Sequence, residues 1–167
     1  NDPAVTGGLL QAVSHATAKA AMFMGAGLIY ATLGHDRIAD LAGVGRQLPM
    51  TLLAFALGGI ALVGLPPAGG FLAKWLLLSA ALTTGQWWWV VVMVAGGLLT
   101  SAYVFIVVMR ALVAVDPENA PKMVVPRHRE AVVLALASLS FLLGLAALLP
   151  VDIVQIGRPQ PFAAGLP

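Results

Sequence analysis

The sequence predicts an all-α membrane protein, a bundle of transmembrane helices, and two observations support this fold class. The chain of 167 residues is 60% hydrophobic and only 10% charged, whereas soluble domains carry roughly 25% charged residues. The charges are also unevenly spread, because residues 48–73 and 75–109 carry none. Several stretches therefore reach the ~20 apolar residues that a membrane span needs. A soluble globular enzyme is excluded.

The first predicted span covers residues 5–33, and Lys19 is its only charged residue. A polar connector over residues 34–48 follows, with apolar residues spaced by three that favour a short interfacial helix. The second helix begins at Pro49, a favoured first helical position. It is broken at residues 66–70, because prolines remove backbone donors and glycines free the backbone. The residues of this break are Pro66, Pro67, Gly69 and Gly70.

The remaining elements follow from apolar runs and the breaks between them. They are a helix that continues to residue 84, a tight turn at 84–86, and two spans over 87–110 and 131–149. Trp87 and its two tryptophan neighbours fit an aromatic belt at the membrane surface. Residues 1–150 thus form one membrane domain, and residues 151–167 are predicted as an extended tail. Because the chain starts without Met or a basic leader, we expect that it carries no signal peptide and that it is a piece of a longer polypeptide.

The number of crossings depends on whether the two helices around the break cross separately or together. With one broken crossing, residues 34–48 and 110–129 share a side of the membrane. That side then holds Arg37, Arg46, Arg110, Lys122, Arg127 and Arg129. The opposite side holds only Arg158. The positive-inside rule therefore favours four crossings with one discontinuous helix, cytoplasmic basic loops, and both termini on the opposite side.

Two residues of the first span are candidates for carrying charge. Lys19 lies near the middle of the span, where a lysine costs roughly 2.5–3.5 kcal/mol on insertion scales. Such a cost is accepted when the charge lines a pathway or pairs with a neighbouring helix. His15 lies four residues earlier on the same helix face and can accept and pass a proton. Gln11 and Ser14 extend this polar face and can hold water, although helix packing explains them equally well.

Lys74 follows the break in an otherwise apolar neighbourhood. Unpaired backbone at membrane depth is tolerated only inside protein or beside water, and discontinuous helices form ion and substrate sites in transporters. One broken crossing makes Lys74 a second buried cation, whereas an interfacial break lets its side chain reach the surface. A plain proline kink is the alternative for the break. Together these features indicate translocation of charge, most simply of protons.

Other chemistry finds no support in the sequence. The chain has no cysteine, which excludes disulfides, thiolate metal ligands and iron–sulfur clusters. Its histidines, His15, His35 and His128, lack the spacing of a metal site. No catalytic triad, phosphate loop or paired carboxylate stands out. We expect no cofactor, no metal and no catalytic or redox centre, and no nucleic acid partner, since no basic run is interleaved with aromatics.

Three ordered motifs resemble the antiporter-like, proton-translocating membrane subunits of respiratory complex I, membrane-bound hydrogenases and multisubunit cation/proton antiporters. The run from His15 to Phe23 resembles their H-x-x-x-K-A-x-x-F stretch. Residues 38–49 resemble their L-x-G-L-x-R-x-x-P connector, and residues 64–74 resemble their G-x-P-P-x-x-G-F-x-x-K break. The resemblance covers Gln11 to Trp75 well and the rest of the chain only by hydropathy.

This resemblance implies a fold of about fourteen helices with two inverted repeats, of which the chain supplies the last four. It implies that His15 and Lys19 link the middle of the proton path to its exit, and that Lys74 is the terminal ionisable residue of the broken helix. Some members carry Glu at the position of Lys74, and some carry a second His where this chain has Gln11. The first repeat is missing, so this piece alone should not complete translocation.

Three functional hypotheses remain open on the sequence. The leading one is a proton-conducting half-channel in a redox-driven complex of NADH:quinone oxidoreductase or membrane-hydrogenase type, in which this chain is a subunit of the translocating enzyme. The alternatives are a subunit of a multisubunit monovalent cation/proton antiporter and a purely structural membrane-arm subunit. The expected partners are the lipid bilayer, other membrane subunits and the remaining helices of the fold. The expected location is a bacterial inner membrane.

Overall fold

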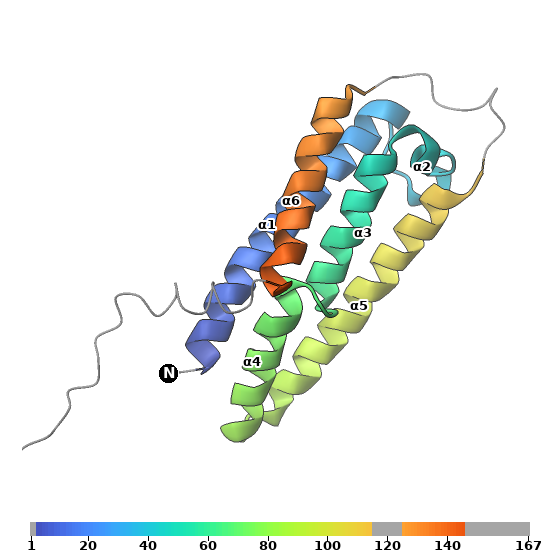
Figure 1. Cartoon of the computed structure of the whole chain (residues 1–167). Helices are drawn as coiled ribbons and strands as arrows, with labels where there is room; N and C mark the ends of the chain where they lie inside the picture. Colours follow the sequence, from blue (N-terminus) through green and yellow to red (C-terminus); the bar gives the residue numbers. More distant parts are fainter. Residues whose placement is uncertain (1–2, 115–124, 146–167) are drawn as a thin grey trace, which may run out of the picture.

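The computed structural model describes residues 3–114 and 125–145, in which helices are the only regular elements and no strand occurs (Figure 1). The elements are α1 (Pro3–Leu33), the 3-10 helix η1 (Ile38–Asp40), α2 (Val44–Gln47), α3 (Pro49–Val63), α4 (Gly69–Thr83), α5 (Trp87–Leu112) and α6 (Arg127–Leu145). The predicted tail over 151–167 lies outside the described residues, as do Lys122, Arg158 and the end of the last predicted span.

Three of the described helices are long and apolar enough to cross a membrane, namely α1, α5 and α6. The helices on either side of the break, α3 and α4, have 15 residues each. At 1.5 Å per residue each is about 22 Å long, short of the ~30 Å hydrocarbon core of a bilayer. Neither half of the broken helix is therefore long enough to span by itself.

The two halves share the same neighbours. Both α3 and α4 pack against α1, α5 and α6, and Figure 1 shows α4 following α3 along the direction of the long helices. The side chains between α1, α3 and α5 form the main core, which contains Ala18, Met22, Leu48, Leu52 and Phe55. The two halves of the broken helix thus follow one another along the bundle, and both pack against the same three helices.

The two basic connecting regions meet at one end of the bundle. The amide of Gly43, just before α2, donates to the carbonyl of Val113 at the end of α5, and α3 and α6 both begin at this end (Figure 1). The glycine at position 45 lies against the backbone of Ala111, where a Cβ would be 3.0 Å from the carbonyl oxygen. Residues 34–48 and the described parts of 110–129 therefore lie together.

Two helix boundaries differ from those predicted by the sequence. The break is Gly64–Ala68 instead of 66–70, because Gly64 ends α3 with a positive φ of 82° and α4 already begins at Gly69. The last helix begins at Arg127, four residues earlier than predicted. This early start places Glu130 inside α6, where the sequence predicted only the end of a loop.

Candidate functional site

The side chain of Lys74 connects the two halves of the broken helix by hydrogen bonds across the break. Lys74 lies on α4, and its ammonium donates to the backbone carbonyls of Leu62 (2.9 Å) and Val63 (2.7 Å) at the end of α3. Side chains on a helix lean toward its N-terminus, which for α4 is the side of the break. The lysine is partly buried in this position.

The two prolines explain why these two carbonyls need a donor. In a continuous helix the carbonyls of Leu62 and Val63 would accept from the amides four residues later. Those positions are Pro66 and Pro67, which have no N–H. The ammonium of Lys74 supplies two donors where the prolines remove two. The break and the lysine are therefore one structural unit.

Glycines make room for the lysine. Gly64 would place a Cβ 2.6 Å from Cδ of Lys74, and a Cβ on Gly97 of α5 would lie 3.7 Å from the ammonium nitrogen. Beside the ammonium lies a cavity of about 330 Å³, lined by Lys74, Gly97 and Ser101 among mostly apolar side chains. An ammonium has three donors, and only two are used within the described residues. The third is available to water in this cavity.

Lys19 and His15 lie on the outer face of α1. His15 is exposed on the surface of this chain and Lys19 is partly buried. The ammonium of Lys19 lies 5.5 Å from the ring centroid of Phe23, one turn further along α1, a distance at which a cation is attracted to an aromatic face. Within residues 3–114 and 125–145, Lys19 has no acidic partner.

His15 and Lys19 lie one turn apart on α1, and Lys74 lies on α4, a helix that packs against α1. Among the described residues, no hydrogen bond connects any two of the three. A proton passing between them would therefore need intervening water or a side chain from other helices.

The two polar neighbours of His15 have different surroundings. Ser14 is buried at 2% exposure, and its carbonyl accepts a hydrogen bond from the Ser140 hydroxyl at 2.9 Å. The two hydroxyl oxygens lie 3.3 Å apart. Ser14 thus joins α1 to α6, which is the packing role that the sequence leaves open. Gln11 has a buried Oε1 without a partner among the described residues, and it remains a candidate for holding water.

Glu130 is a buried acidic residue of the described part of the chain that is not among the candidates predicted from the sequence. Its side chain is 3% exposed, and Oε2 accepts hydrogen bonds from the amide and the hydroxyl of Thr51, each at 3.1 Å. The two residues are 79 positions apart, so no local pattern connects them. The only sequence signal is an acidic residue close to the start of an apolar helix.

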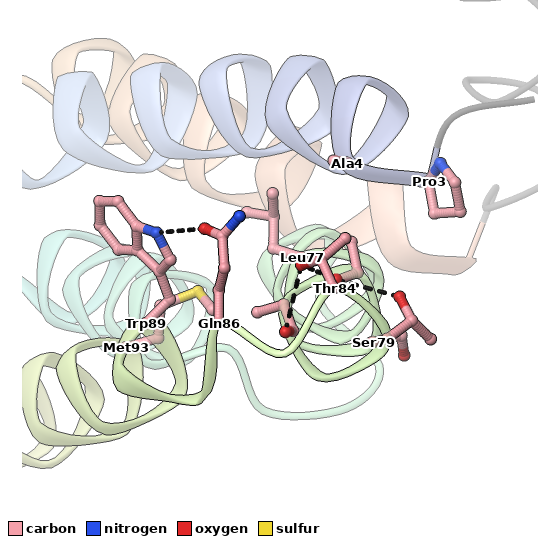
Figure 2. Close-up of a pocket in the computed structure, with 11 residues that line it drawn as sticks. Pro3, Ala4, Leu77, Ser79, Thr84, Gln86, Trp89 and Met93 are labelled. Carbon is pink, nitrogen blue, oxygen red and sulfur yellow. Dashed lines mark hydrogen bonds between the residues drawn. The ribbon is translucent and has the colours of Figure 1, made fainter.

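A second cavity lies away from the ionisable residues. It has a volume of about 610 Å³ and lies between the start of α1, the end of α4 and the start of α5 (Figure 2). Its polar groups are hydroxyls and the amide of Gln86, which accepts a hydrogen bond from Nε1 of Trp89 at 3.1 Å. None of its lining residues is ionisable, so its chemistry differs from that of the Lys74 site.

Fold and site together define a class of protein: a helical membrane protein whose discontinuous helix is capped by a lysine. The chain belongs to the family described as NADH:quinone oxidoreductase/Mrp antiporter, transmembrane, which matches residues 2–100. This match confirms the resemblance carried by the three motifs. The matched range includes α1, both halves of the broken helix and half of α5.

Relatives within this family come from several kinds of complex. The chain is 34% identical over 108 residues to NADH-quinone oxidoreductase subunit N of Desulforudis audaxviator, covering 65% of this chain and 22% of that protein. It is 34% identical over 73 residues to formate hydrogenlyase subunit 3 of Escherichia coli, covering 44% and 12%. The chain therefore spans less than a quarter of the length of these relatives.

A solved structure has the same fold. The structure of the Mrp complex from Dietzia sp. DQ12-45-1b contains a chain that matches with a TM-score of 0.69, covering 89% of this chain and 36% of that chain at 23% identity. At this identity the likeness concerns the fold alone. It extends beyond the family match to most of the residues of this chain.

Proposed function

We propose that this chain forms a proton-conducting half-channel of an antiporter-like subunit in a redox-driven complex of NADH:quinone oxidoreductase or membrane-hydrogenase type. The observation that carries the proposal is the Lys74 ammonium, held at the break by the carbonyls of Leu62 and Val63 and bordered by a cavity. A group that loses and regains a proton in the membrane needs a partner for its charged form and access to water. Lys74 has both.

Lys19 and His15 are proposed to pass protons toward Lys74. Their support is the shared face of α1 and the packing of α1 against α4, the helix that carries Lys74. Because a lysine facing lipid is costly, this face of α1 needs cover from other helices. The exposed small residues Gly8, Ala12 and Ala16 leave space for a close approach. The proposed partners are the remaining helices of a fourteen-helix fold and other membrane subunits.

The proposed topology has four crossings, with α3 and α4 together forming one. Two halves of about 22 Å each that pack against the same three helices suit a single discontinuous crossing. The basic loops at the start of α3 and the end of α5 are then cytoplasmic, and the turn around Gly85 faces the opposite side of a bacterial inner membrane. Single cysteines introduced at Arg46 and Gly85 would react with an impermeant reagent from opposite sides; labelling from one side contradicts this topology.

The substitution Lys74→Arg in the full-length subunit tests the relay. Arginine keeps a positive charge and several donors for the two carbonyls but does not release a proton in proteins. We expect the complex to assemble and redox-driven proton translocation to fall to background, while Arg46→Lys, at an exposed site, pumps normally. Normal pumping by Lys74→Arg would instead support the purely structural role, in which the lysine only caps α3.

The cation/proton antiporter remains the second candidate, because the family that the chain belongs to includes both kinds of complex. Both candidates use the same residues, so the driving force must be measured. Proton uptake into inverted vesicles, driven by electron donors without added sodium, is expected for the redox-driven complex. Proton movement that follows an imposed sodium gradient and ignores electron donors would favour the antiporter.

A further inference from the structure

The carboxylate of Glu130 caps a helix other than its own. It belongs to the first turns of α6, and its Oε2 accepts from the amide and the hydroxyl of Thr51 near the start of α3. Both residues are enclosed, with exposures of 3% for Glu130 and 0% for Thr51. A Cβ on Gly25 of α1 would contact Thr51 at 3.4 Å. Three helices thus surround the contact.

The start of α3 needs this cap because its own residues provide none. The N-cap position is Leu48, which makes no side-chain capping hydrogen bond. Pro49 has no N–H, and the amides of the first turn have no partner within a helix. The first turn also carries the positive end of the helix dipole, which an anion stabilises. Glu130 supplies both an acceptor and a negative charge.

The other end of α3 is held by a charge of opposite sign. There the Lys74 ammonium donates to the last carbonyls of the helix, which carry the negative end of the dipole. An anion from α6 and a cation from α4 therefore hold the two ends of a helix of 15 residues. Each charge matches the end of α3 that it contacts.

The helix that carries Glu130 also reaches the break. Ser140 of α6 donates to the carbonyl of Ser14 on α1. Further along α6, a Cβ on Gly144 would collide with the carbonyl oxygen of Pro67 and the backbone of Ala68. One rigid helix thus fixes the start of α3 through Glu130 and lies against the break through Gly144.

We propose that Glu130 is a positioning residue for Lys74. Its charge anchors the start of α3 to α6, and α3 transmits this placement to the carbonyls of Leu62 and Val63, where the Lys74 ammonium binds. The importance of this placement for translocation rests on the function proposed above for Lys74. The anchoring of α3 by Glu130 does not depend on that function.

The test uses the full-length subunit in its membrane complex and a set of matched variants. Glu130→Gln keeps the shape and an acceptor but removes the charge, and Asp36→Asn makes the same change at an exposed carboxyl. Met50→Glu, at a partly exposed residue in the first turn of α3, puts a negative charge back on this turn. The two readouts are proton translocation and hydrogen exchange in peptides covering residues 49–63.

We expect Glu130→Gln to speed exchange in α3 about fivefold, the effect of removing an anion from the positive end of a helix dipole, and to slow translocation in an assembled complex. Asp36→Asn should behave as the wild type. Adding Met50→Glu to Glu130→Gln should restore both readouts, because the charge matters and not the particular side chain. Thr51→Val, which removes only the hydroxyl donor, should shift both readouts in the same direction by a smaller amount.

Several results would overturn the proposal. Exchange in Glu130→Gln equal to that in Asp36→Asn would show that Glu130 does not anchor α3. Exchange restored by Met50→Glu without restored translocation would show that the Glu130 carboxyl itself takes part in proton transfer. If Glu130→Gln fails to assemble, an unchanged Thr51→Val refutes the anchor. If Lys74→Arg pumps normally, the proposed function fails, and the exchange data alone decide the role of Glu130.

Discussion

Replacing Lys74 with methionine should destabilise the broken helix, although it removes a partly buried charge. Methionine has a similar length and no donor. The carbonyls of Leu62 and Val63 then lose both hydrogen bonds, and Pro66 and Pro67 offer no amide in return. The substitution thus leaves two carbonyls unpaired, and it also removes the free-energy cost of partly burying a cation.

The structure allows the size of the effect to be estimated. An unsatisfied buried acceptor costs ~1–3 kcal/mol, and the adjacent cavity of about 330 Å³ can admit water that pairs with part of this loss. We take the lower end of the range for both carbonyls, which gives a loss of about 2 kcal/mol. Replacing a buried charge by an apolar group can be stabilising when its partners are removed too, but here both carbonyls remain.

Thermal unfolding of the full-length subunit in lipid nanodiscs measures this loss. Leu78→Met is the matched control, because Leu78 lies one turn further along α4, lines the same cavity and has no polar contact to lose. We expect a clearly lower midpoint for Lys74→Met than for Leu78→Met. Equal or higher stability of Lys74→Met would refute the reasoning, since the cost of the buried cation would then outweigh its two hydrogen bonds.

Three further substitutions test the packing around the break. Gly70→Ala should destabilise by ~1–3 kcal/mol, because a Cβ there runs into the carbonyl of Ala61; Gly96→Ala, where a Cβ meets open space, is its control in the same unfolding assay. Ser140→Ala should cost about 1 kcal/mol by removing the hydrogen bond to Ser14, and stability unchanged from the wild type would contradict that role. Trp89→Phe, which loses an exposed hydrogen bond and changes the ring stacked on Trp88, should change stability by less than about 0.5 kcal/mol, and a larger loss would show that the indole supports the cavity of Figure 2.

The sequence predicts the helices and the break well because their signals are local. Long apolar runs have few other uses, and two consecutive prolines interrupt a helix because they remove two backbone donors. The same reasoning identifies Lys74 as unusual, since a lone charge in an apolar neighbourhood needs no structural context to stand out. It does not predict the partner of the lysine, because that depends on the reach of one side chain across the break.

The features of the site that cannot be predicted from the sequence depend on contacts between distant segments. Glu130 meets Thr51 across 79 positions, and only the packing of α6 on α3 decides whether a carboxyl at this point is buried or exposed. Ser14 is a similar case, since its polarity is visible in the sequence but its bond to Ser140 is not. Local patterns thus identify candidate residues, and the tertiary structure assigns their contacts.

The contact between Lys74 and the end of α3 couples the protonation of this lysine to the stiffness of the broken helix. The same ammonium that is proposed to lose a proton also connects the two halves of the broken helix. A charged donor forms hydrogen bonds about twice as strong as a neutral one, so each deprotonation would loosen this connection and each protonation would tighten it. The bending stiffness between α3 and α4 would then rise and fall with every proton that passes.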